Sequence, residues 1–174
     1  MAAGFQFDGN NFKFYCHYGA ADRFAEGTFS VNHDTIVLKS NKVPGNDFNI
    51  VKQATVPGQY TVKVSDSNKF LIQYAVCLVM EGDKTARFTA NKEGIIHFEA
   101  HKNAKVYIKH DLYPDIPTLL KDEQSTVNYF EVTLKPSLEQ LSFKGIDLFL
   151  KEDGLTWHPN YFIGAENVRF EKEN

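Results

Sequence analysis

Three polar residues near the middle of the chain alternate with apolar ones in a way that suits metal binding. His97, Glu99 and His101 stand at positions i, i+2 and i+4 and alternate with Ile96, Phe98 and Ala100. Successive side chains of a strand point to opposite faces, so the three polar groups would share one face. Imidazole and carboxylate groups are ordinary zinc ligands. The same pattern is typical of the wet face of a strand. A metal site would also require a ligand from another strand, because the outer positions lie roughly 13 Å apart.

A second set of candidate residues begins at the single tryptophan. Trp157, His158, Tyr161 and Phe162 surround Pro159. Aromatic rings in such a loop can form a platform for a sugar or a partner chain. The alternative is a loop whose rings close one end of the hydrophobic core. We take the four residues as candidate binding residues.

Motifs for other chemistry are missing from the sequence. It contains no Gly-x-Ser-x-Gly elbow and no glycine-rich phosphate loop. Residues 8–10 and 152–154 resemble fragments of calcium loops, but the remaining ligands do not follow, which is typical of plain turns. We therefore expect no catalytic residue and no cofactor.

Charge and hydropathy narrow the classes of partner. The formal net charge is −3 and the pI is about 6.1, which argues against nucleic acid, because nucleic-acid binding needs a basic face. No apolar run approaches the roughly 20 residues of a membrane span. A protein or glycan partner remains, and the oligomeric state stays open.

The elements that must position these candidates are strands. Residues 85–110 alternate apolar and polar side chains through three short runs separated by turns. Residues 27–40 predict a hairpin with Phe29, Val31, Ile36 and Leu38 facing inward. Residues 70–80 are apolar on both faces and predict a strand in the middle of a sheet. Together with the 15 Phe and 8 Tyr residues, these patterns predict an all-β fold. We expect an antiparallel β-sandwich, with a lipocalin-like β-barrel as the alternative.

We expect one domain over residues 1–174, and any boundary would fall near residues 65–69. Cys16 and Cys77 favour two free buried thiols, with one disulfide as the alternative. The first residues show no signal-peptide pattern. Localisation therefore stays unknown, and a secreted or periplasmic location is favoured if a signal has been removed.

Part of the chain is similar to known β-sandwich domains. Thr89 and Gly94 ahead of a strand, a strand at residues 106–108 and another at 128–134 resemble the carboxypeptidase regulatory-like, or transthyretin-like, β-sandwich over residues 60–136. That family usually has Asp where this chain has Asn91. The hairpin at residues 27–38 is similar to the opening hairpin of small lipocalin-like bacterial envelope proteins. Either resemblance implies a non-enzymatic module at the bacterial cell surface or in the periplasm.

Three functions follow as expectations. The first is a non-catalytic binding or assembly module of the bacterial cell envelope, acting through loops and sheet edges. The second is a lipocalin-like carrier of a small apolar ligand, which needs an internal cavity. The third is a metal-dependent enzyme that uses the strand of His97.

Overall fold

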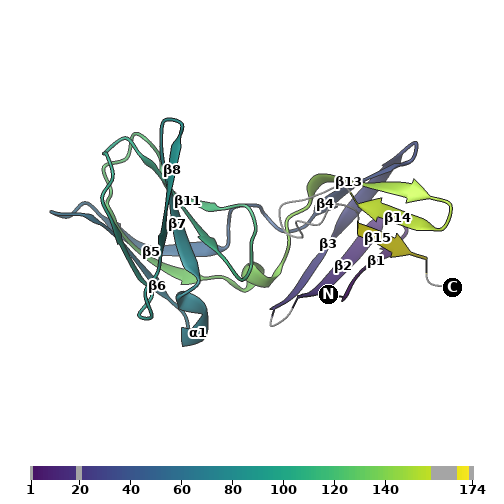
Figure 1. Ribbon diagram of the computed structural model, residues 1–174, viewed down its shortest axis with the longest axis horizontal. Helices are drawn as coiled ribbons and strands as arrows, with labels where there is room; N and C mark the ends of the chain where they lie inside the picture. The colour runs from purple at the N-terminus through teal and green to yellow at the C-terminus, as the bar shows by residue number, and fades with distance from the viewer. Residues whose placement is uncertain (1, 19–20, 158–167, 173–174) are drawn as a thin grey trace. The chain divides into compact units, whose positions relative to one another are not determined.

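The regular elements of the described chain are nearly all β-strands, which confirms the all-β prediction (Figure 1). A computed structural model describes residues 2–18, 21–157 and 168–172. The chain divides into two compact units. Unit 1 comprises Met1–Val43 and Glu139–Asn174, and unit 2 comprises Pro44–Leu138.

Unit 1 is an antiparallel meander. Its described residues form one seven-stranded sheet in the order β1-β2-β3-β4-β13-β14-β15. The strands follow the order of the chain, and unit 2 is inserted between neighbouring strands β4 and β13. The bounds are β1 (Ala2–Asp8), β2 (Asn11–Tyr18), β3 (Ala21–Asn32), β4 (Thr35–Ser40), β13 (Lys144–Lys151), β14 (Gly154–Trp157) and β15 (Val168–Glu171).

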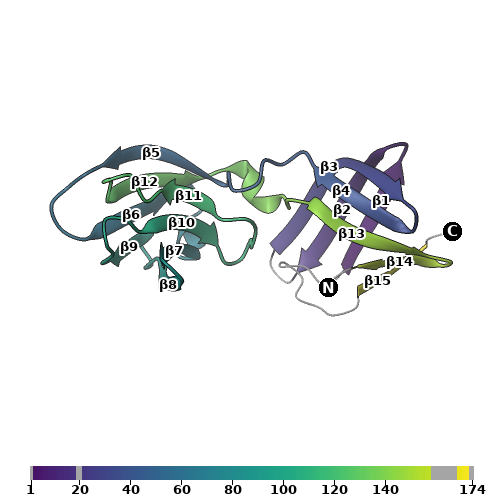
Figure 2. The same ribbon diagram turned by 90° about the horizontal axis from the view of Figure 1, so that it is seen from above.

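The sheet of unit 1 is curled (Figure 2). Its inner side packs around a core rich in aromatic rings. Alternate residues of β2 point inward, so Phe12, Phe14 and Cys16 are buried while the residues between them are exposed. Phe5 of β1 and Phe170 of β15 meet across the core, with ring centroids 5.0 Å apart in an edge arrangement. The first and last strands of the sheet therefore approach one another, and the sheet is nearly closed like a barrel.

Unit 2 is a sandwich of two four-stranded sheets, and all of its residues are described. The sheet orders are β5-β12-β6-β9 and β11-β10-β7-β8. Strands β6 and β12 pair in parallel, whereas the other pairs are antiparallel. The bounds are β5 (Phe48–Ala54), β6 (Tyr60–Ser65), helix α1 (Lys69–Ile72), β7 (Ala75–Glu81), β8 (Lys84–Thr89), β9 (Ile95–Phe98), β10 (Lys105–His110), β11 (Thr118–Lys121) and β12 (Tyr129–Leu134), followed by the 3₁₀ helix η1 (Pro136–Glu139).

The alternation over residues 85–110 is confirmed in two of its three runs. Ile96 and Phe98 of β9 and Val106 and Ile108 of β10 are buried in the core of unit 2. In β8 the alternation predicts that Ala86 faces inward with Phe88 and Ala90, and this is wrong for Ala86, which is exposed. Strand β8 is the last strand of its sheet, so it has a neighbour on one side and less cover than β10.

The prediction of a strand in the middle of a sheet is confirmed for residues 75–80, which lie in β7 between β10 and β8, and is wrong for residues 70–74. The segment begins as the helical turn α1 and becomes strand β7 at Ala75. Asn68 caps the helix, because its side-chain oxygen accepts the backbone N–H of Phe70 at 3.0 Å. The apolar run therefore crosses from a capped turn into a sheet.

The predicted hairpin at residues 27–40 is confirmed as strands β3 and β4. Asn32 pairs with Thr35, which leaves a two-residue turn at His33 and Asp34. Ile36 and Leu38 are buried as expected. Val31 is exposed, contrary to the expectation, at a position next to the turn.

The structure divides the chain into two compact units, and the single domain expected over residues 1–174 stays a prediction. Residues 65–69, where a boundary was expected, lie inside unit 2, and the observed boundaries follow Val43 and Leu138. Both cysteines are free and buried, as the sequence favours. Among the described residues, no helix is long and apolar enough to cross a membrane.

Candidate functional site

The outer surface of β1, β2 and β3 is the candidate site in unit 1. We call it the β1–β3 face. Strand pairing fixes which side chains stand next to one another, because residues opposite each other on paired strands share a face. Four cross-strand rows result: Ala2, His17 and Asp22; Gly4, Tyr15 and Phe24; Gln6, Lys13 and Glu26; and Asp8, Asn11 and Thr28.

Two aromatic residues occupy paired positions in the second row. Tyr15 and Phe24 are opposite one another on β2 and β3, and their exposed fractions are 46% and 42%. Gly4 completes the row on β1, and the Tyr15 ring lies across it. A Cβ atom at Gly4 would stand 2.5 Å from the Tyr15 hydroxyl oxygen. The missing side chain at Gly4 therefore leaves the space that the Tyr15 ring occupies.

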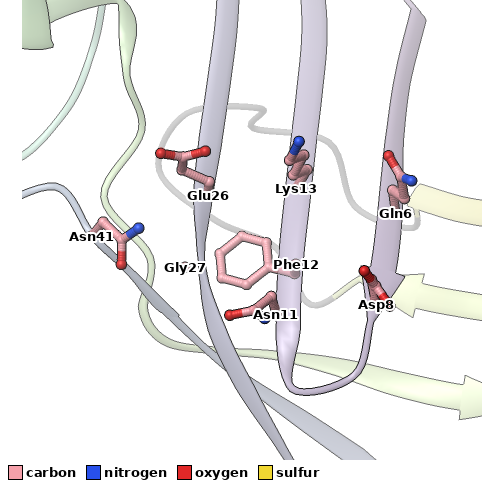
Figure 3. Close-up of a pocket in the computed structure, with 8 residues that line it drawn as sticks. All are labelled: Gln6, Asp8, Asn11, Phe12, Lys13, Glu26, Gly27 and Asn41. Carbon is pink, nitrogen blue, oxygen red and sulfur yellow. The ribbon is translucent and has the colours of Figure 1, made fainter.

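A polar pocket of about 330 Å³ adjoins the aromatic row. Figure 3 shows Gln6, Lys13 and Glu26 on three neighbouring strands, with Asp8 and Asn11 beside the β1–β2 turn. The row of Lys13 lies about 7 Å along the strand from the row of Tyr15. The pocket and the rings thus belong to one continuous surface. Its walls carry three amides, two carboxylates and one ammonium group, from Gln6, Asn11, Asn41, Asp8, Glu26 and Lys13, with Phe12 and Gly27 between them.

Close backbone packing holds the far side of the pocket. The backbone N–H of Asn41 donates a hydrogen bond to the backbone carbonyl oxygen of Glu26 at 2.8 Å, which places Asn41 beside β3. Gly27 is buried, and a Cβ atom there would lie 2.0 Å from the Lys39 carbonyl oxygen. Glycine at position 27 therefore allows β3 and β4 to approach closely at this point.

On the other side of the aromatic row, a histidine pairs with a carboxylate. His17 Nδ1 and Asp22 Oδ1 are 2.7 Å apart, and both side chains are exposed. The His17 and Tyr15 ring centroids lie 5.8 Å apart. Polar residues therefore border the aromatic row on both sides. The face can accept and donate hydrogen bonds around the two aromatic side chains.

The structure places Trp157 in the hydrophobic core of unit 1. Its exposed fraction is 4%, and its ring lies 5.3 Å from both Phe5 and Phe14. Trp157 therefore follows the alternative given for this segment, in which its ring closes the hydrophobic core, rather than the binding role. His158, Tyr161 and Phe162 lie outside the described residues, and their binding role stays a prediction.

The three candidate metal ligands are not brought together. Strand β9 ends at Phe98, so Glu99 and His101 lie beyond it. His97 Nδ1 is 3.0 Å from Thr61 Oγ1, whereas His101 Nδ1 is 3.0 Å from Glu81 Oε2. In the part of the chain that the structure describes, no group of three or more His, Cys, Asp or Glu residues could hold a metal ion. The metal site stays a prediction.

His101 instead tethers its loop to β7. Its backbone N–H donates to Glu81 Oε1 at 2.7 Å, in addition to the side-chain contact. The pKa of Glu81 is lowered mainly by the hydrogen bond from the backbone N–H of His101, and to a smaller extent by the hydrogen bond with the His101 side chain. The pair is a connection between a loop and a strand within unit 2.

A second ionisable group is buried in unit 2. The Lys121 side chain is nearly inaccessible, and its Nζ donates to the carbonyl oxygens of Lys102, Ala104 and Asp122 at 2.6, 2.9 and 2.8 Å. Burial lowers the pKa of Lys121. Three carbonyls satisfy the three donors of the ammonium group, so this lysine joins β11 to the loop ahead of β10.

Sequence reasoning missed the residues of the β1–β3 face. The signal was present in β2, where Tyr15 occupies a position on the polar side of the alternation between Lys13 and His17. A large aromatic ring on the wet side of a strand departs from the pattern. Phe24 could not be paired with it from the sequence, because the register of β2 and β3 was unknown.

No family model, curated protein or solved structure matches the chain. The resemblances to transthyretin-like and lipocalin-like domains therefore stay predictions.

Proposed function

We propose that the chain is a non-catalytic binding module that holds its ligand on the β1–β3 face. The observation that carries the proposal is the pair of exposed rings, Tyr15 and Phe24, standing beside a polar pocket. Large apolar groups exposed next to one another lose favourable burial energy unless a partner covers them. The proposal places binding on a sheet face, rather than on the loops and edges that the sequence suggested.

The setting of the polar groups supports binding over catalysis. Lys13, Glu26 and Asp22 are exposed to solvent on the outer side of the sheet. Catalytic groups gain strength when they are held in a site from which water is excluded. Exposed groups on paired strands are better suited to positioning a ligand than to activating one.

The filled core supports a binding face over a carrier. Ring centroids of Phe5, Phe14 and Phe143 lie 4.6 to 6.1 Å apart inside the curled sheet. A carrier of lipocalin type would need open volume there. We keep the cell-envelope location as a proposal that rests on the two sequence resemblances.

A paired screen of the full chain tests the proposal. Hydrolase substrates report turnover, and immobilised saccharides, peptides and lipid vesicles report retention. We expect retention without turnover, and retention lost in a variant carrying Tyr15→Ala and Phe24→Ala. The matched control is Val31→Ala, which truncates an exposed apolar residue elsewhere on β3. Turnover that Glu26→Gln abolishes would overturn the proposal, as would retention that the double variant leaves unchanged.

A further inference from the structure

We infer that the ligand of the β1–β3 face is a neutral saccharide, with a sugar ring on Tyr15 and Phe24 and its hydroxyls on the flanking polar rows. This inference rests on the proposed function and adds the chemical class of the ligand. It follows from the rings, the polar groups, the size of the pocket and its charge.

The ring pair offers the contact that a sugar ring needs. A pyranose presents C–H groups on its faces and hydroxyls around its rim. The electron-rich face of an aromatic ring attracts the weakly positive hydrogens of such C–H groups. Tyr15 and Phe24 belong to neighbouring strands, and the ring of Tyr15 is held across Gly4. The Tyr15 part of the contact surface is therefore set before a ligand arrives, which lowers the entropy cost of binding.

The polar rows match the rim of a sugar. Each hydroxyl both donates and accepts a hydrogen bond. On one side of the rings stand the amide of Gln6, the ammonium of Lys13 and the carboxylate of Glu26. On the other side stand His17 and Asp22. A mixture of donors and acceptors on both sides suits a polyhydroxylated ligand, whereas a lipid chain would leave these groups desolvated and unpaired.

Size separates a saccharide from a protein partner. A pocket of about 330 Å³ lies at the lower end of the range for small-ligand sites, about 300–1,000 Å³. A stable protein interface buries about 800 Å² on each partner and has an apolar centre. The β1–β3 face offers one aromatic row between polar rows, which is enough for a sugar ring and a poor centre for a protein interface.

Charge selects among saccharides. Asp8 and Glu26 line the pocket with one cation, Lys13, so the lining carries one net negative charge. Asp22 adds a carboxylate paired with His17 on the far side of the rings. An acidic sugar would meet repulsion from these carboxylates. Neutral sugars are therefore the expected ligands.

Affinity electrophoresis of the full chain tests the inference. The gels contain either a neutral polysaccharide (glucan, mannan or xylan) or the acidic polysaccharide polygalacturonate. Calorimetry with the matching oligosaccharides then gives Kd. We expect retardation by a neutral glycan and none by polygalacturonate. Tyr15→Ala and Phe24→Ala should each raise Kd about tenfold or more. Tyr15→Phe keeps the ring and should stay within about threefold of the parent.

Further variants examine the polar rows and the position of the ring. Glu26→Gln and Lys13→Met should each weaken binding, because each removes a charged hydrogen-bonding group from the pocket. Gly4→Ala should weaken binding by displacing the Tyr15 ring, although no contact group has been removed. Val31→Ala is the control that should leave Kd unchanged. Circular dichroism and thermal unfolding verify that each variant is folded.

The outcomes separate this inference from the proposed function. If no saccharide binds while a peptide or vesicle is retained and then lost in the Tyr15→Ala and Phe24→Ala variants, the saccharide class is wrong and the binding face stands. Preference for polygalacturonate would overturn the neutral class. If a bound saccharide is indifferent to both ring variants, or if nothing in the screen binds, both proposals fail.

Discussion

Lys121 shows at the scale of one residue how a charge is kept inside unit 2. The ammonium group is buried, yet three carbonyl oxygens lie within 2.9 Å of it. Such a group contributes through its hydrogen bonds, because an unpaired buried charge would be costly. The sequence shows only a lysine at the end of a short apolar run, and nothing in that pattern indicates burial.

Replacing Lys121 with Met should destabilise the protein. The change keeps an unbranched side chain but removes the donor to three carbonyls, and we expect a loss of about 2–4 kcal/mol in the free energy of unfolding. The control is Lys105→Met, whose side chain is 40% exposed and pairs with Glu123; we expect a change of about 1 kcal/mol or less there. Urea unfolding of the full chain measures both. Equal effects in the two variants would contradict the role given to Lys121.

Cys77 should be inert in the folded protein. Burial raises its pKa to about 12, so the reactive thiolate is scarce near neutral pH. Burial raises the pKa of Cys16 as well, although Arg23 partly offsets the effect. We expect a thiol reagent to leave Cys77 unmodified until urea unfolds the chain, as measured by mass spectrometry of the labelled peptides. Rapid labelling of Cys77 under native conditions would show that its surroundings are open.

At the scale of elements, the period-two alternation predicts strands well and says little about how strands pair. Strands β9 and β10 have the expected inward residues. Helix α1 was missed, because the capping oxygen of Asn68 precedes a run whose apolar residues suit either a helix or a strand. The sequence alone can place Tyr15 and Phe24 in strands, but only the register of β2 and β3 shows that they are paired. A candidate site built from three paired strands is therefore hidden until the pairing is known.

Gly27→Ala should weaken the pairing of β3 with β4. The new methyl group would lie 2.0 Å from the backbone carbonyl of Lys39, and backbone cannot move aside as a flexible side chain can. We expect a loss of about 1–3 kcal/mol in the free energy of unfolding. Thr28→Ala, at the next and exposed position of β3, is the matched control. Unfolding curves that coincide for Gly27→Ala and the parent would disprove the close approach.

The tether between Glu81 and His101 should be lost in acid. Hydrogen bonds from His101 lower the pKa of Glu81 below its ordinary value of 4.5, so the folded state holds this proton less tightly than the unfolded state. The stabilisation is present above pH 4.5 and disappears as the pH falls through the lowered pKa. NMR titration of the Glu81 carboxyl should give a midpoint below 4.5. His101→Gly keeps the backbone donor and should keep a low midpoint, whereas a midpoint at 4.5 or above in the parent would contradict the tether.

At the scale of the whole molecule, the chain consists of a meander interrupted by a sandwich. The expected sandwich and its barrel alternative each describe one unit, because unit 2 has two facing sheets and unit 1 has a curled one. The sequence could not show this division, since the first unit is made from two distant segments and no change of composition marks the crossings. Strands β4 and β13 pair across a gap of more than one hundred residues in the chain.

Unit 2 should fold when produced alone as residues 44–138. Its ends meet, because Phe48 pairs with Leu134 and the Lys135 amide donates to the Asp47 carbonyl at 2.9 Å. It also has a buried core of its own. We expect a cooperative thermal transition and dispersed NMR signals for the fragment. A fragment with the spectrum of an unfolded chain would show that the insertion depends on unit 1.

If the β1–β3 face is the binding surface, mapping of amide chemical shifts should locate the ligand there. The full chain would be titrated with the ligands retained in the screen, and the shifted residues assigned. We predict the largest shifts at Gly4, Lys13, Tyr15, Phe24 and Glu26, with little change around His97 or in the aromatic core of unit 1. Shifts centred on the core rings would instead indicate a carrier, shifts centred on His97 would indicate the metal-site hypothesis, and either result would contradict the account.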